Sequence, residues 1–192
     1  MPEGIGCAKS SSRSPRTKSR FSEIMWVEAM DAYLLDTTIL SIYLDPMHPH
    51  HAEKSQSLAA LPAESPRFIS AVALAELGFG VKLAAVIGKG NLPMIVQASS
   101  HAVLDISHHT AGAYAEVKAR VAQKYLARML RKDRPKYIEE WVDKATGQKL
   151  GIDENDLWMC AQAKERDLVF VTADGRMKRI PDADSDVRLL II

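Results

Sequence analysis

The sequence is poor in cysteine. Only two cysteines occur among its 192 residues, Cys7 in a polar segment and Cys160 in an apolar one. No CxxC pair is present, so neither a disulfide framework nor a cysteine-based zinc site is expected. This cysteine usage is typical of the reducing cytoplasm, which is the location we predict.

Long apolar runs and net charge are missing too. No run approaches the roughly 18 apolar residues that span a bilayer, and residues 21–28 are too short and too acidic for the core of a signal peptide. We therefore expect no membrane contact. The formal net charge is +1, so binding to a polyanion would need a local patch. Phosphate-loop, GxGxxG and HExxH motifs are absent.

Residues 1–30 differ in composition from the rest of the chain. Ser and Arg dominate residues 10–16, and such a segment cannot bury enough apolar area to offset the entropy lost on ordering. We predict a disordered tail over residues 1–30 and one domain over residues 31–192. That length, with 47% hydrophobic residues, is sufficient for a single core.

Short apolar runs alternate with helical periodicity along the predicted domain. Strands are predicted at residues 32–35, 67–70, 103–106, 168–172 and 187–191, and helices at 38–44, 51–61, 71–86, 110–130 and 154–166. Strands separated by helices form a parallel sheet that is covered on both faces. We therefore predict an α/β fold with three α/β/α layers and about five parallel strands. Ligand sites in such folds lie beyond the carboxyl ends of the strands.

Four acids occupy notable places in this pattern. Asp36 and Asp174 follow predicted strands, Glu76 lies in an apolar helix, and Asp156 lies in the first turn of another helix. Such acids can meet at one edge of a parallel sheet, where their repulsion is costly unless cations hold them. Mg²⁺ and Mn²⁺ prefer these hard oxygen ligands. The four acids therefore indicate a divalent-metal site and phosphate chemistry.

Some of these acids also have a structural interpretation. Asp153 and Asp156 fit the N-cap and first turn of a helix, and Asp174 precedes a glycine, as in a turn. Glu76 is harder to explain in this way, because an acid among apolar neighbours is costly to bury unless it is paired. Asp36 has few structural reasons to be acidic. We assign Asp153 to the helix cap and the other four acids to the site.

Four blocks of the sequence resemble those of PIN-domain nucleases, especially the VapC toxins of bacterial toxin–antitoxin pairs. They are residues 33–40 with Asp36, 69–80 with Glu76, 153–163 with Asp156, and 168–174 with Asp174. The blocks occur in the family order. Two features depart from the family pattern. Residues 130–150 form a longer and more charged segment, and Gly175, Arg176 and Met177 stand where an aromatic residue often follows the last acid.

The resemblance implies a Mg²⁺- or Mn²⁺-dependent endoribonuclease that hydrolyses RNA phosphodiester bonds, acting as the toxin of a type II toxin–antitoxin pair. Asp36 and Asp156 would be the principal metal ligands. Glu76 and Asp174 would complete the site, partly through water, and the Thr172 hydroxyl would orient the acids. The implied partners are RNA, a small antitoxin whose helix covers the acidic cleft, and a second copy of the chain.

Basic residues recur at every fourth position in the helix predicted at 110–130. Arg120, Lys124 and Arg128 form this stripe, which can follow an RNA backbone and would make binding salt-dependent. A solvated helix face explains the same pattern equally well. We take the three residues as candidates for substrate binding.

Two other functions remain open. A phosphatase with Asp36 as its nucleophile would need a second aspartate two residues later, where Thr38 stands. A catalytically inactive PIN-like scaffold that binds RNA would not need all four acids, and all four are present. Cys160 is assigned to the core rather than to nucleophilic catalysis, because no basic neighbour is evident.

Overall fold

A single parallel sheet organises the chain. The computed structural model describes residues 30–88, 97–98, 101–126 and 133–192. The strands are β1 (Tyr33–Leu35), β2 (Arg67–Ser70), β3 (Ala102–Leu104), β4 (Val169–Thr172) and β5 (Arg188–Ile191). Their order in the sheet is β3-β2-β1-β4-β5, and all neighbours run parallel. The predicted number and direction of the strands are confirmed.

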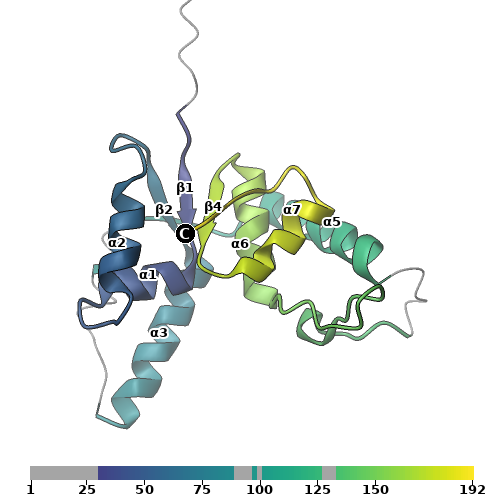
Figure 1. The fold of residues 1–192 in the computed structure, drawn as a ribbon, viewed down its shortest axis with the longest axis horizontal. Helices are drawn as coiled ribbons and strands as arrows, with labels where there is room; N and C mark the ends of the chain where they lie inside the picture. The colour runs from purple at the N-terminus through teal and green to yellow at the C-terminus, as the bar shows by residue number, and fades with distance from the viewer. Residues whose placement is uncertain (1–29, 89–96, 99–100, 127–132) are drawn as a thin grey trace, which may run out of the picture.

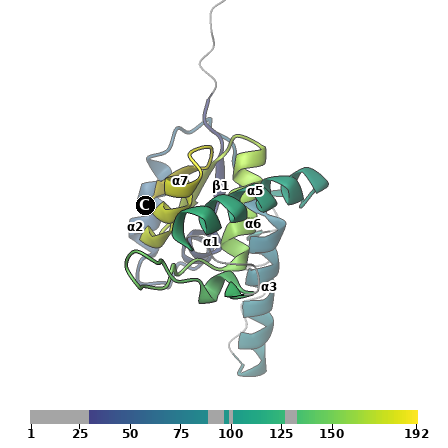
Figure 2. The same cartoon turned by 90° about the vertical axis from the view of Figure 1, so that its right-hand side faces the viewer.

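Helices cover both faces of this sheet. They are α1 (Thr37–Leu44), α2 (His51–Ala59), α3 (Ala71–Val86), α5 (His108–Tyr125), α6 (Glu154–Glu165) and α7 (Arg179–Ala183), with short 3-10 helices η2 (Ile138–Glu140) and η3 (Gly175–Lys178). Figures 1 and 2 place α2 on the opposite side of the sheet from α5 and α7, and they show α3 projecting from the body. This arrangement confirms the predicted three-layer α/β/α fold. None of the described helices combines the length and apolar character needed to cross a membrane.

Alternate strand residues enter two separate cores. Leu34 and Phe170 are fully buried in the larger core, which α3, α5 and α6 complete. Tyr33, Leu35 and Val171 point to the other face and pack with residues of α1 and α2. Burial of both faces is the expected state of a parallel sheet.

Side-chain caps set the starts of several helices. The helix at 71–86 has the predicted bounds, and it starts at Ala71 because the Ser70 side chain accepts the Val72 N–H at 3.0 Å. The helix predicted from 110 begins at His108, because Ser107 caps it instead. Residues 1–29, and with them nearly all of the predicted tail, lie outside the described residues.

The centre of the sheet is its topological switch point. From β1 the chain proceeds to β2 and β3 on one side, whereas β4 and β5 lie on the other. Ligand sites form at such points, beyond the carboxyl ends of the strands. Asp36 directly follows β1 there, and its backbone N–H donates to the Val171 carbonyl of β4 at 2.9 Å.

Candidate active site

Asp36 is a buried acid at the end of the central strand. It is 5% exposed, and its Oδ2 accepts a hydrogen bond from Thr172 Oγ1 at 2.7 Å. Burial raises the pKa of Asp36 to about 6 and the charge of Glu76 adds to this increase, whereas the Thr172 hydrogen bond opposes it. This hydrogen bond is the kind of contact through which Thr172 is predicted to orient the acids.

Asp156 completes the capping box of a helix and also belongs to the site. Its Oδ2 accepts the Asp153 N–H at 3.0 Å, and its own N–H donates to Asp153 Oδ1 at 2.8 Å. This reciprocal pair is a capping box at the start of α6, which confirms Asp153 as the cap. Burial raises the pKa of Asp156 to about 7, and the charges of Asp153, Asp36 and Asp174 add to the increase. A capping role alone does not require Asp36 and Asp174 to lie close enough to Asp156 to raise its pKa.

Asp174 follows β4 and is held by an arginine. Arg176 Nε lies 2.9 Å from each carboxylate oxygen of Asp174, and the Arg176 NH2 group lies 2.6 Å from Oδ2. Hydrogen bonding by Arg176 keeps the pKa of Asp174 below its usual value. The residue that departs from the family pattern is thus a cation beside the last acid, a role that the sequence analysis missed.

One cavity of about 310 Å³ brings three of the four predicted acids together. Its lining residues are Asp36, Thr38, Glu139, Gly151, Ile152, Asp153, Asp156, Asp174 and Arg176. Five of these nine residues are acids and one is a cation, so we call it the acidic cavity. Glu139, from the charged segment after α5, was not predicted, because no local motif marks it.

Glu76 lies beside the acidic cavity without lining it. Its Oε2 accepts a hydrogen bond from Thr37 Oγ1, and its Oε1 accepts one from Asn155 Nδ2 at 2.7 Å. Thr37 follows Asp36, and Asn155 precedes Asp156. Glu76 therefore contacts the immediate neighbours of the two buried acids, and these contacts offset the cost of placing it in an apolar helix.

The acidic cavity suits a hard divalent cation. Among the described residues, no group of three Asp, Glu, His or Cys side chains already has the arrangement of a metal site. Mg²⁺, however, is commonly held by one or two carboxylates together with water and substrate oxygens, and Asp36 and Asp156 line one cavity. A cation there would offset the burial and the repulsion by neighbouring acids that raise both pKa values.

The predicted basic stripe has intramolecular partners. Arg120 pairs with Asp184 and, at 3.0 Å, with Asp186. Lys124 donates to the backbone carbonyl of Asp182, and Arg128 lies outside the described residues. The described part of the stripe fastens the C-terminal segment to α5, and its use in RNA binding stays a prediction.

Comparison with known families gives a clear assignment. The model of the PIN domain family matches residues 33–183, well over half of the chain. The chain therefore belongs to the PIN domain family, a family of nucleases, as its four sequence blocks predicted. A comparison with curated protein sequences gives no significant match.

Solved structures of toxin–antitoxin complexes share the fold. VapBC-1 from nontypeable Haemophilus influenzae aligns with a TM-score of 0.52 and 20% identity, over 83% of this chain and 97% of that chain. VapBC2 from Rickettsia felis, bound to a DNA fragment from its promoter, aligns at 0.51 and 20%, over 83% and 98%. A toxin–antitoxin complex from Klebsiella pneumoniae aligns at 0.51 and 17%, over 83% and 96%.

Proposed function

We propose that this protein is an endoribonuclease that depends on Mg²⁺ or Mn²⁺. The main support is the position of Asp36 and Asp156 in one cavity at the switch point between β1 and β4. The raised pKa values mean that both carboxylates are costly to keep ionised in the folded protein, and a bound cation would remove this cost. Membership of a nuclease family gives that site its chemistry.

The proposed roles follow from the contacts. Asp36 and Asp156 would hold the ion, with Asp174 and Glu76 completing the site. When bound, the ion would neutralise the scissile phosphate, activate a water molecule and steady the leaving oxygen. Thr172 fixes the orientation of the Asp36 carboxylate through its hydrogen bond.

We further propose that the nuclease is the toxin of a type II toxin–antitoxin pair in the cytoplasm. The similar solved chains belong to such complexes. A second cavity, of about 880 Å³, is lined by Ala71, Val72, Ala75, Glu76, Phe79, Ile106, Asn155 and Trp158. This groove is mostly apolar, and apolar grooves accept amphipathic helices. An antitoxin helix bound there would contact Glu76 and Asn155, directly beside the acidic cavity.

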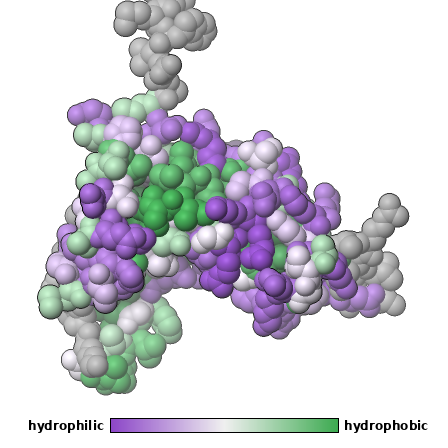
Figure 3. All heavy atoms as spheres, viewed as in Figure 1, coloured by the Kyte–Doolittle hydropathy of each residue, from purple (hydrophilic) through white to green (hydrophobic). Residues whose placement is uncertain are grey.

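The projecting part of α3 exposes large apolar side chains that a second copy of the chain could cover. Leu83 and Val86 are 59% and 80% exposed, and Figure 3 shows apolar surface at the end of this helix. Apolar surface of this kind marks interaction sites. We propose that it contributes to a homodimer.

Cleavage assays test the nuclease function. The full-length protein and its Asp36→Asn variant are incubated with structured RNAs in Mg²⁺, Mn²⁺ or EDTA. Cleavage that requires the metal and disappears in the variant supports the proposal. Tight RNA binding without metal-dependent cleavage would instead identify an inactive scaffold, and a trapped aspartyl-phosphate on Asp36 would identify a phosphatase.

A further inference from the structure

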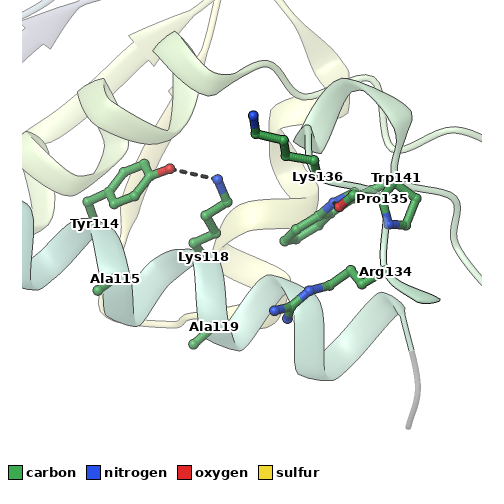
Figure 4. Close-up of a pocket in the computed structure, with 8 residues that line it drawn as sticks. All are labelled: Tyr114, Ala115, Lys118, Ala119, Arg134, Pro135, Lys136 and Trp141. Carbon is green, nitrogen blue, oxygen red and sulfur yellow. Dashed lines mark hydrogen bonds between the residues drawn. The ribbon is translucent and has the colours of Figure 1, made fainter. Parts of the chain in front are cut away.

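A third cavity lies between α5 and the charged segment that follows it. Its volume is about 550 Å³. It is lined by Tyr114, Ala115, Lys118, Ala119, Arg134, Pro135, Lys136 and Trp141. Three of these residues are cations and none is an acid, so we call it the cationic hollow. Figure 4 shows Lys118 on the helix and Arg134 and Lys136 on the facing segment, around Trp141.

Two of the three cations have no acidic partner among the described residues. Lys118 Nζ lies 2.5 Å from Glu154 Oε1 and 2.7 Å from the Tyr114 hydroxyl. Arg134 and Lys136 are exposed, and neither forms an ion pair within the described part of the chain. Burial and the charge of Arg134 lower the pKa of Lys118, whereas the charge of Glu139 raises it, so Lys118 and Arg134 lie close enough to repel each other. A bound anion would relieve this repulsion.

The hollow has a fixed wall. Trp141 is 2% exposed, and its Nε1 donates to the Pro135 carbonyl at 3.0 Å. Lys118 Nζ and Arg134 Cζ lie 5.9 Å and 6.0 Å from the centre of a Trp141 ring. A buried tryptophan therefore positions the segment that carries Arg134 and Lys136, and its ring attracts two of the three charges.

A short chain of contacts joins the hollow to the acidic cavity. Lys118 pairs with Glu154, and the Glu154 N–H donates to Glu139 Oε1 at 3.1 Å. Glu139 lines the acidic cavity, and Trp141, two residues later, lines the hollow. The segment that contains Glu139 and Trp141 therefore contributes a residue to each cavity.

We propose that the cationic hollow binds a backbone phosphate of the RNA strand, next to the phosphate that is cleaved. This inference rests on the proposed nuclease function. An acidic cavity repels a polyanion, and adjacent cations offset that repulsion and set the position of the strand. Arginine offers a planar pair of donors that matches a phosphate, and lysine adds a compact charge. The hollow lies within the range of about 300–1,000 Å³ typical of ligand sites.

Binding measurements on the full-length protein test the hollow. The Arg134→Ala/Lys136→Ala variant removes two exposed side chains, and thermal unfolding checks that it folds. Fluorescence anisotropy with labelled single-stranded RNA in EDTA gives the affinity over a series of KCl concentrations. Loss of one neutralised phosphate should reduce the slope of log K against log [KCl] by about 0.7 and weaken binding several-fold. Cleavage in Mn²⁺ should show a raised KM with kcat unchanged.

A charge-matched control separates the hollow from overall charge. Lys82→Ala/Lys178→Ala also removes two exposed positive charges that have no ion pair among the described residues, and it should keep the wild-type slope. If both double variants change the slope equally, or if Arg134→Ala/Lys136→Ala changes neither slope nor affinity while the wild type cleaves RNA, the hollow is not a phosphate site. If Arg134→Ala/Lys136→Ala lowers the salt slope as expected but the wild type cleaves no RNA, the nuclease proposal fails and the hollow stands as an RNA-binding site.

Discussion

The hydroxyl of Thr172 donates a 2.7 Å hydrogen bond to Oδ2 of Asp36, from the end of β4 to the end of β1. Thr172 is fully buried, and the same hydroxyl accepts the N–H of Asp174 at 3.1 Å. One side chain therefore positions the acids that follow two neighbouring strands.

Removing this hydroxyl should destabilise the protein. Thr172→Val keeps the side-chain shape but leaves a buried carboxylate oxygen without its donor, at a cost of about 1–3 kcal/mol. We expect the free energy of unfolding in urea, at about pH 8 in EDTA, to fall by that amount. Thr172→Ser keeps the hydroxyl and serves as the control. If Thr172→Val is as stable as the wild type, or loses no more stability than Thr172→Ser, the hydrogen bond does not make this contribution.

The acidic cavity should make the metal-free protein less stable as the pH rises. The pKa values of Asp36 and Asp156 are about 6 and about 7, above the ordinary 3.8. The folded protein therefore binds these protons more tightly than the unfolded chain. Their contribution to stability is fully present below about pH 4 and is lost as the pH rises through these two values. Urea unfolding in EDTA from about pH 4 to about pH 8 measures this loss.

Asp36→Asn isolates the contribution of one acid. A pKa difference of about two units corresponds to roughly 3 kcal/mol, so the variant should gain about that much relative to the wild type between pH 4 and pH 8. A gain in stability that accompanies a loss of activity is typical of a site rather than of a structural carboxylate. If the stability curves of the variant and the wild type run parallel across this pH range, the burial argument is wrong.

Arg176 should compete with metal ions for Asp174. Its guanidinium contacts both oxygens of Asp174, and an ion that uses Asp174 has to displace it. The Arg176 side chain is 62% exposed, so the pair contributes at most about 1 kcal/mol. We expect Arg176→Gln to tighten Mn²⁺ binding by about fivefold or less, measured by calorimetry, with Arg176→Lys in between. Weaker binding in the Gln variant would instead make Arg176 a supporting residue of the site.

Gly151 should be intolerant of a side chain because of Arg176. A Cβ at position 151 would lie 2.8 Å from Arg176 Cδ, and Gly151 has a φ of +65°. Gly151→Ala therefore combines the cost of moving the exposed Arg176 side chain away from Asp174, at most about 1 kcal/mol, with a backbone cost of about 1–2 kcal/mol. In an Arg176→Ala background only the backbone cost should remain. A double-mutant cycle in urea measures the coupling, and a coupling energy of zero would contradict the contact.

Local signals account for what the sequence predicted well. Ser70 and Asp153 cap the helices that carry Glu76 and Asp156, so both helix starts could be predicted from neighbouring residues. The strand ends at Asp36 and Asp174 follow from apolar runs, and parallel topology brings such ends to one edge of the sheet.

Contacts between distant segments account for what was missed. The partners of Glu76, Thr37 and Asn155, lie 39 and 79 residues away in the chain, and no periodicity reports such a pairing. Arg120, a candidate for RNA binding, pairs with Asp184, 64 residues later, and no pattern in the sequence indicates this contact. The stripe pattern does not distinguish these outcomes, because an exposed cation and one that holds another segment have the same spacing.

Mn²⁺ binding to the full-length protein at about pH 7.5, measured by calorimetry, tests most directly the claim that Asp36 and Asp156 hold a divalent ion. Asp36→Asn and Asp156→Asn are compared with Glu64→Gln, which removes one exposed acid outside the acidic cavity. We predict that each Asn variant weakens Mn²⁺ binding by about tenfold or more, and that Glu64→Gln binds like the wild type. Wild-type affinity in both Asn variants, or no Mn²⁺ binding by the wild type, would contradict the account.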